Sequence, residues 1–277
     1  MPSPLQILLA SFIESISNLL PFSHRLGDYV LQNLNIADET PANVHTLTLS
    51  GVVLALLVYF RHDILSQIVS VIRLILERKR PTSIDERLPW LYLVSWVPYL
   101  ITFVLSKQSG LAVWLENGLL WGGGPLLFSG LFLLWIEKRA VPQKGYAAWN
   151  VTEAFLIGLF SALAPIPGLD RLTTASWIGR MRSFRVDALF KFLLISSIPL
   201  LILKLMIEGV HLNDAYHEVG LLHTAIALGG SFAMSTFIAS FLCGLKPPTH
   251  LIHWAWVKII FGLLACWVGY QAHLTAF

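Results

Sequence analysis

The sequence predicts an all-α, polytopic membrane protein with about six transmembrane helices and two re-entrant helical hairpins in an inverted-topology repeat. Three observations support this fold class. Of 277 residues, 56% are hydrophobic and only 13% are charged, whereas a soluble domain carries about 25% charged residues. Two apolar segments are broken by proline and polar residues, and Lys and Arg are unevenly distributed among the loops.

The sequence contains six long apolar blocks, and several of them approach or exceed the roughly 20 residues with which a helix crosses a bilayer. They cover residues 47–60, 88–105, 111–136, 189–207, 221–242 and 251–270. So few charged side chains cannot cover a water-facing surface, which argues against a large soluble protein with buried helices. We therefore expect a single membrane domain over residues 1–277.

The two broken segments cannot cross the membrane as uninterrupted helices. One reads ESISNLLPFSHR from Glu14 to Arg25, and the other reads APIPGLDRLTT from Ala164 to Thr174. Broken helices are tolerated at membrane depth where their free backbone groups line a cavity. We predict re-entrant hairpins over residues 4–35 and 149–180.

The two breaks also resemble each other, because each has a proline, two further residues, a polar residue, arginine and leucine. These runs are 21–26 and 167–172, and each is followed by apolar blocks in a similar order. An internal repeat of this kind is common in membrane transporters. We expect the first repeat over about 1–136 and the second over about 149–277.

The positive-inside rule orients this arrangement. With re-entrant hairpins, segments 61–87, 137–148 and 180–191 are cytoplasmic and contain six, three and four Lys or Arg residues. Outer loops 35–44 and 209–220 contain none, and Lys107 is the one basic residue in an outer loop. Both termini are then predicted outside, and the hairpins enter from opposite faces.

Ionisable residues at membrane depth are costly and are functional candidates by default. If the hairpin tips meet near the midplane, their polar residues share one cavity. Arginine binds phosphate oxygens bidentately, and helix N-termini bind anions. Carboxylates can hold a divalent cation, Mg²⁺ or Ca²⁺, and histidine can transfer protons or act as a nucleophile. These groups suit hydrolysis of a phosphoanhydride on a lipid.

We assign roles on this basis. The catalytic candidates are Glu14, Ser23, His24, Asp170 and Arg171. The substrate-binding candidates are Ser17, Asn18, Arg25, Gly168, Arg171, Thr173 and Thr174, and the metal candidates are Glu14 and Asp170. Alternatively, the arginines neutralise the acids as structural ion pairs, His24 caps a helix, and the hydroxyls bond the backbone. The other eight histidines, including His45, lack metal-ligand spacing, and we predict structural roles for them.

The first hairpin motif, Glu14 to Ser23, and the second, Gly158 to Arg171, resemble the undecaprenyl-diphosphate phosphatase family, also known for bacitracin resistance. The family patterns are E-G-x-x-E-x-L-P-(V/I)-S-S-(T/S)-G-H and G-x-x-Q-x-x-A-x-x-P-G-x-S-R-S-G. Stretches 49–61, 188–194 and 256–262 are also similar, so the resemblance covers about nine tenths of the chain.

The resemblance implies a hydrolase of the bacterial cytoplasmic (inner) membrane that removes the terminal phosphate of undecaprenyl diphosphate. This reaction recycles the lipid carrier of peptidoglycan synthesis. Glu14 matches the first acid of the motif, Ser23 the first serine and Arg171 the arginine. Asn18 replaces the second acid, Asp170 replaces a serine, and the motif histidine falls on Gly27.

Two accounts follow from these differences. In the first, which we prefer because each hairpin retains charged groups, His24 supplies the imidazole and Asp170 the second carboxylate. In the second, the protein is a non-hydrolytic polyprenyl-phosphate translocase or binding protein on the same fold. The expected partners are the polyprenyl diphosphate lipid and the membrane, and no nucleic acid is expected. We also consider a homodimer.

Overall fold

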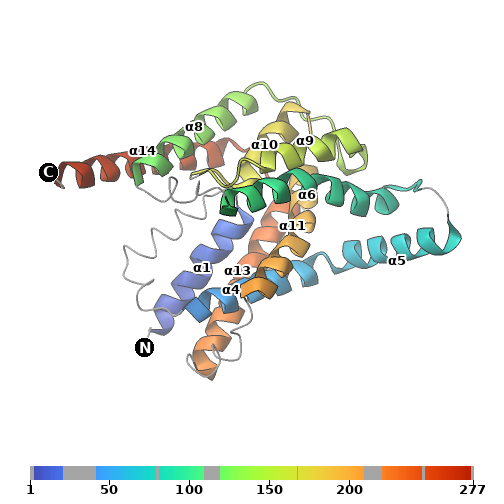
Figure 1. Ribbon diagram of the computed structural model, residues 1–277, viewed down its shortest axis with the longest axis horizontal. Coiled ribbons are helices and arrows are strands. Elements are labelled where there is room, and N and C mark those ends of the chain that lie inside the picture. The colour runs from blue at the N-terminus through green and yellow to red at the C-terminus, as the bar shows by residue number, and fades with distance from the viewer. Residues whose placement is uncertain are drawn as a thin grey trace. The chain divides into compact units, whose positions relative to one another are not determined.

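The structure is a computed structural model that describes residues 3–20, 42–78, 81–108, 119–166, 168–208, 220–244 and 247–275. The described residues form helices joined by turns, with one isolated bridge between Lys144 and Phe184 (Figure 1), which confirms the predicted all-α class. The chain divides into two compact units. Unit 1 comprises Met1–Leu20, His24–Leu65 and Lys191–Pro247, and unit 2 comprises Pro21–Ser23, Ser66–Phe190 and Pro248–Phe277.

Each predicted apolar block contributes to a long helix. These helices are α4 (Ala42–Tyr59), α6 (Ile84–Gln108), α8 (Leu119–Glu137), α11 (Val186–Glu208), α13 (Leu221–Cys243) and α14 (Ile252–Thr275). Within the described ranges, the helical stretches Val186–Ile207 and Leu221–Cys243 are each long and apolar enough to cross a membrane. If two helices that are joined at a sharp bend are counted as one span, the number of candidate membrane spans is three. A polytopic membrane protein fits these helices, and the number of six spans stays a prediction.

The second helix of this bent pair begins the segment 61–87, which is predicted to be cytoplasmic from its six basic residues. α5 (Arg61–Glu77) continues the chain one residue after α4 and is bent from it by 71°. The cytoplasmic location stays a prediction. Leu65, Ile72 and Leu76 are exposed on α5, and apolar residues recur along it at helical spacing.

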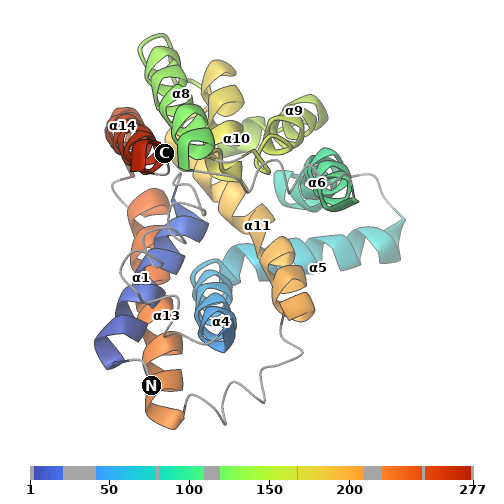
Figure 2. The same ribbon diagram turned by 60° about the vertical axis from the view of Figure 1, so that its left-hand side comes forward.

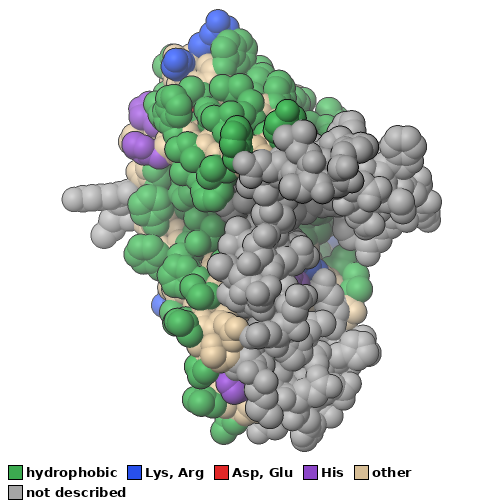
Figure 3. All heavy atoms as spheres, turned by 90° about the vertical axis from the view of Figure 1, so that its left-hand side faces the viewer, with side chains coloured by type: hydrophobic (Ala, Val, Ile, Leu, Met, Phe, Trp, Pro, Cys, Tyr) green, Lys and Arg blue, Asp and Glu red, His purple; other side chains and the backbone are tan. Residues whose placement is uncertain are grey.

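The surface of the described helices is strongly apolar. Large hydrophobic side chains are exposed on helices of both units, including Leu221 and Phe237 on α13 and Trp256 and Leu263 on α14. Figure 3 shows hydrophobic side chains gathered over the described part of one face. Soluble monomers rarely expose large contiguous apolar patches, so this surface is typical of a protein in contact with lipid.

In unit 1, α13 packs against α4 and against α1 (Pro4–Leu19), and Figure 2 shows α1 and α13 side by side. α1 begins where Ser3 and Gln6 form a capping box, which satisfies free N–H groups at the helix start. Ser11 and Ser15 each donate to a backbone carbonyl of α13 at 3.3 Å. Hydroxyl contacts of this kind join helices in a membrane.

In unit 2, α8 and α14 pack side by side through glycines (Figure 2). A Cβ at Gly130 on α8 would lie 2.8 Å from the carbonyl oxygen of Ala255 on α14. A Cβ at Gly262 on α14 would lie 2.7 Å from the backbone nitrogen of Leu127. Glycine therefore allows the two backbones to approach closely, as small residues do in membrane helix pairs.

We expect Gly130→Ala to destabilise the protein by about 1–3 kcal/mol, because the added methyl group overpacks the contact with α14. Gly124→Ala on the same helix is the matched control, since nothing lies within 4 Å of a Cβ there. Thermal unfolding in detergent, followed by tryptophan fluorescence, measures both variants. Equal melting temperatures would contradict the close packing of α8 on α14.

Candidate active site

The second predicted hairpin segment forms two short helices in unit 2 (Figure 1). α9 (Val151–Ser161) begins after Asn150, whose side chain accepts a hydrogen bond from the Glu153 amide. α10 (Arg171–Met181) begins after Asp170. Each helix has 11 residues, which gives a length of roughly 16 Å. Neither crosses a bilayer alone, so the helix–break–helix pattern is present, and its insertion into the membrane stays a prediction.

A buried ion pair anchors the end of α10. The Arg180 guanidinium donates through Nε and through Nη2 to the two carboxylate oxygens of Glu137 at the end of α8. Arg180 Nη1 also donates to the carbonyl oxygen of Phe184 at 2.9 Å. Neither side chain of the pair is exposed. A buried pair needs such additional hydrogen bonds to offset its desolvation.

A second ion pair cluster lies near the same end of the hairpin. The Glu153 carboxylate contacts Lys144 Nζ at 2.6 Å and Arg182 Nε at 3.0 Å. The hydrogen bond from Arg182 to Glu153 and the Glu153 charge raise the pKa of Arg182. Lys144 and Arg182 lie in segments 137–148 and 180–191, which were both predicted to be cytoplasmic from their charges. Because both side chains pair with Glu153, that carboxylate links the two segments.

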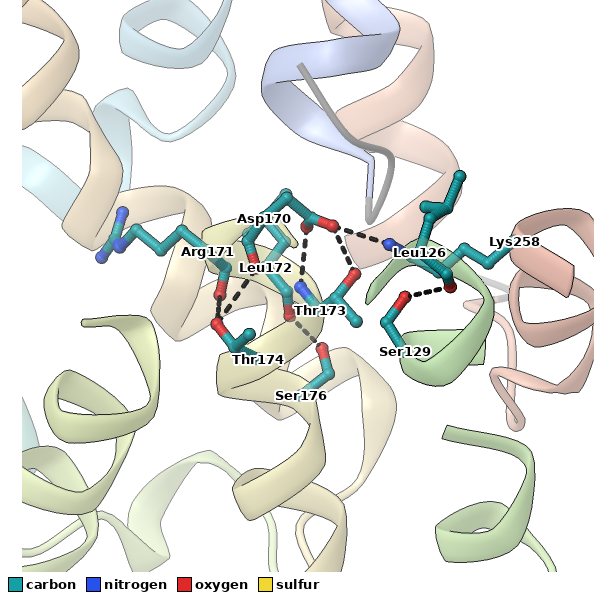
Figure 4. Close-up of polar contacts among 9 residues, drawn as sticks. All are labelled: Leu126, Ser129, Asp170, Arg171, Leu172, Thr173, Thr174, Ser176 and Lys258. Atoms are coloured by element: carbon teal, nitrogen blue, oxygen red, sulfur yellow. Dashed lines mark hydrogen bonds and ion pairs between the residues drawn. The ribbon is translucent and has the colours of Figure 1, made fainter. Parts of the chain in front are cut away.

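At the other end of α10, Asp170 caps the first turn (Figure 4). Its Oδ2 accepts from the Thr173 amide at 2.8 Å, and its Oδ1 accepts from Thr173 Oγ1 at 2.6 Å. Thr174 Oγ1 donates to the Asp170 carbonyl at 3.0 Å. Such bonds satisfy amides that the helix leaves free at its start. Thr173 and Thr174, predicted to bind substrate, therefore use their hydroxyls within the turn.

Gly168 gives the turn before α10 its backbone conformation. Its φ of 81° lies in the left-handed region, which glycine adopts without the steric cost of a Cβ. The predicted role of Gly168 in substrate binding stays a prediction, and its place in the turn is a sufficient reason for glycine at this position.

Lys258 on α14 neutralises Asp170 (Figure 4). Lys258 Nζ lies 2.7 Å from Asp170 Oδ1, the lysine side chain is fully buried, and the Asp170 side chain is 10% exposed. Sequence reasoning missed Lys258, although a lone lysine within the apolar block 251–270 was a usable signal. Donors already contact both Asp170 oxygens, and one of them is the Lys258 ammonium. The role of Asp170 as a metal ligand stays a prediction.

Arg171 extends away from the Asp170 carboxylate (Figure 4). Its guanidinium carbon lies 5.7 Å from the ring centroid of Tyr99 on α6, within range of a cation–π interaction. Asp170 thus takes its countercharge from Lys258 rather than from the neighbouring arginine. The guanidinium retains its positive charge at the start of α10.

The other described candidates lie in unit 1, around Glu14 on α1. The Glu14 side chain is 4% exposed, and its Oε1 lies 3.1 Å from His45 Nε2 on α4. Asn18 Nδ2 donates to the same oxygen at 2.7 Å. Ser17 Oγ is buried and has no hydrogen-bond partner among the described residues. His45 was predicted to be structural, and no spacing in the sequence linked it to Glu14.

Several predictions fall outside what the structure describes. Ser23, His24 and Arg25 lie outside the described residues. Glu14 and Asp170 belong to different units, so the expected meeting of the hairpin tips stays a prediction. Among the described residues, no group of three or more His, Cys, Asp or Glu side chains could hold a metal. The divalent cation also stays a prediction.

We expect Lys258→Met to destabilise the protein by about 3–5 kcal/mol, because it leaves the Asp170 carboxylate buried without a countercharge. Lys191→Met is the matched control, since Lys191 pairs with Asp63 at 2.6 Å with both side chains about one-third exposed, where a pair contributes at most about 1 kcal/mol. The double variant Asp170→Asn with Lys258→Met should recover much of the loss. Thermal unfolding measures all three, and similar small losses for both lysine variants would contradict a buried pair.

Comparison with known proteins adds a separate line of evidence. A sequence model of a family described as bacitracin resistance protein BacA matches residues 7–264. A protein named undecaprenyl-diphosphatase from Myxococcus xanthus is 28% identical, over 77% of this chain and 71% of its own length. Proteins of the same name from Jannaschia sp. and Pelobacter propionicus are 24% and 27% identical, over 95% and 93% of this chain and 98% and 94% of their own lengths.

Proposed function

This chain belongs to the bacitracin resistance protein BacA family, and we propose that it is a membrane hydrolase that removes the terminal phosphate of undecaprenyl diphosphate or a similar polyprenyl diphosphate. Water is the acceptor, and the products are the polyprenyl phosphate and inorganic phosphate. The reaction recycles the lipid carrier of cell-wall synthesis. The bacterial cytoplasmic membrane is the proposed location, with both termini outside.

The observation that carries this proposal is the charge at the start of α10. Asp170 pairs with Lys258, and the Arg171 guanidinium extends away from the Asp170 carboxylate (Figure 4). Arginine presents a planar fork of donors that matches the oxygens of a phosphate, and helix N-termini favour anions. A diphosphate is therefore a suitable ligand for Arg171.

Glu14 is the second residue to which we assign a role in the reaction. Its carboxylate is buried and accepts from Asn18, which suits a group that orients a proton-transferring partner. We assign Asp170 to holding the start of α10 and not to acid–base chemistry, because both its oxygens already accept hydrogen bonds. Ser23 and His24 stay catalytic candidates, and Arg25 stays a candidate phosphate ligand.

We expect Arg171→Ala to lower the rate of phosphate release from undecaprenyl diphosphate by about 10²–10³-fold, the usual effect of removing a preorganised donor to transition-state charge. Arg171→Lys should retain part of the activity, because lysine keeps the charge but loses the bidentate fork. Arg185→Ala is the control, since Arg185 is exposed and pairs with Asp187. Purified protein is assayed with Mg²⁺, with Ca²⁺ and with a chelator.

Absence of phosphate release from the wild-type protein in all three conditions would reject the hydrolase. If such a protein still moved polyprenyl phosphate across liposome membranes, it would be a non-hydrolytic carrier. Unchanged release from Arg171→Ala would reject the role of this arginine. Activity that survives chelation would remove the need for a divalent cation.

A further inference from the structure

Unit 1 contains a carboxylate–imidazole pair whose two members differ in exposure. Glu14 Oε1 and His45 Nε2 are 3.1 Å apart, and their side chains are 4% and 35% exposed. Glu14 comes from the middle of α1, and His45 comes from the first turn of α4. The imidazole is thus the member of the pair that reaches a surface.

The carboxylate is held in place on its own helix. Asn18, one turn further along α1, donates Nδ2 to Glu14 Oε1 at 2.7 Å and to the Glu14 carbonyl at 2.9 Å. A carboxylate that is oriented in this way selects one tautomer of the neighbouring ring and stabilises the imidazolium form. In the pair, Nε2 is the ring nitrogen that faces Glu14.

We propose that His45, paired with Glu14, is a catalytic acid–base residue of this protein; this inference depends on the phosphatase activity proposed above. Nδ1 accepts a proton from water as the water oxygen bonds to the terminal phosphorus. The bond from that phosphorus to the bridging oxygen breaks, and its electron pair leaves with the polyprenyl phosphate. The imidazolium then releases its proton to solvent, and Glu14 stays ionised throughout.

Substitution of His45 tests this role. His45→Ala should lower kcat for undecaprenyl diphosphate by about 10²–10⁴-fold, the usual contribution of a general acid or base. KM should change little, whereas the melting temperature should fall, because the substitution removes a partner of the buried Glu14 carboxylate. Added imidazole should restore part of the activity of His45→Ala. His62→Ala is the matched control, since His62 is an exposed histidine on α5.

The outcomes are distinguishable. Loss of kcat with imidazole rescue supports catalysis by His45. If wild-type protein releases phosphate and His45→Ala retains its kcat, or loses activity that added imidazole does not restore, His45 is not the acid–base residue. Glu14→Gln should also lower kcat, and unchanged kcat in that variant would overturn the pair. Wild-type protein that releases no phosphate would reject the proposed function itself.

Discussion

Ionised side chains inside so apolar a protein must find partners, and in this chain the partners hold both ends of one short helix. Arg180 at the end of α10 pairs with Glu137 on α8, and Asp170 at its start pairs with Lys258 on α14. Removing one member of such a pair leaves a buried charge, which is strongly destabilising. α10 is therefore held by α8 and α14, two helices that also pack against each other through glycines.

This arrangement has a consequence for the chemistry. Lys258 neutralises Asp170, and we assign phosphate binding to the neighbouring Arg171. In unit 1, Glu14 is engaged by Asn18 and His45. Phosphate binding is thus assigned to Arg171 on α10, and proton transfer is assigned to the Glu14–His45 pair on α1 and α4.

The sequence predicted the helices and the second hairpin segment because both depend on residues that are close together in the chain. Apolar blocks predicted the long helices, and the proline, glycine and polar residues before Arg171 predicted the break. The pairs Lys258–Asp170 and Glu14–His45 were missed, because local spacing carries no information about which side chains meet across helices.

Hydrolysis in water enriched in ¹⁸O tests the central claim most directly. The account predicts that water attacks the terminal phosphorus, so the released inorganic phosphate should contain one ¹⁸O atom and the polyprenyl phosphate none. Mass spectrometry of both products distinguishes the outcomes. Label in the polyprenyl phosphate, or no released phosphate, would contradict the account.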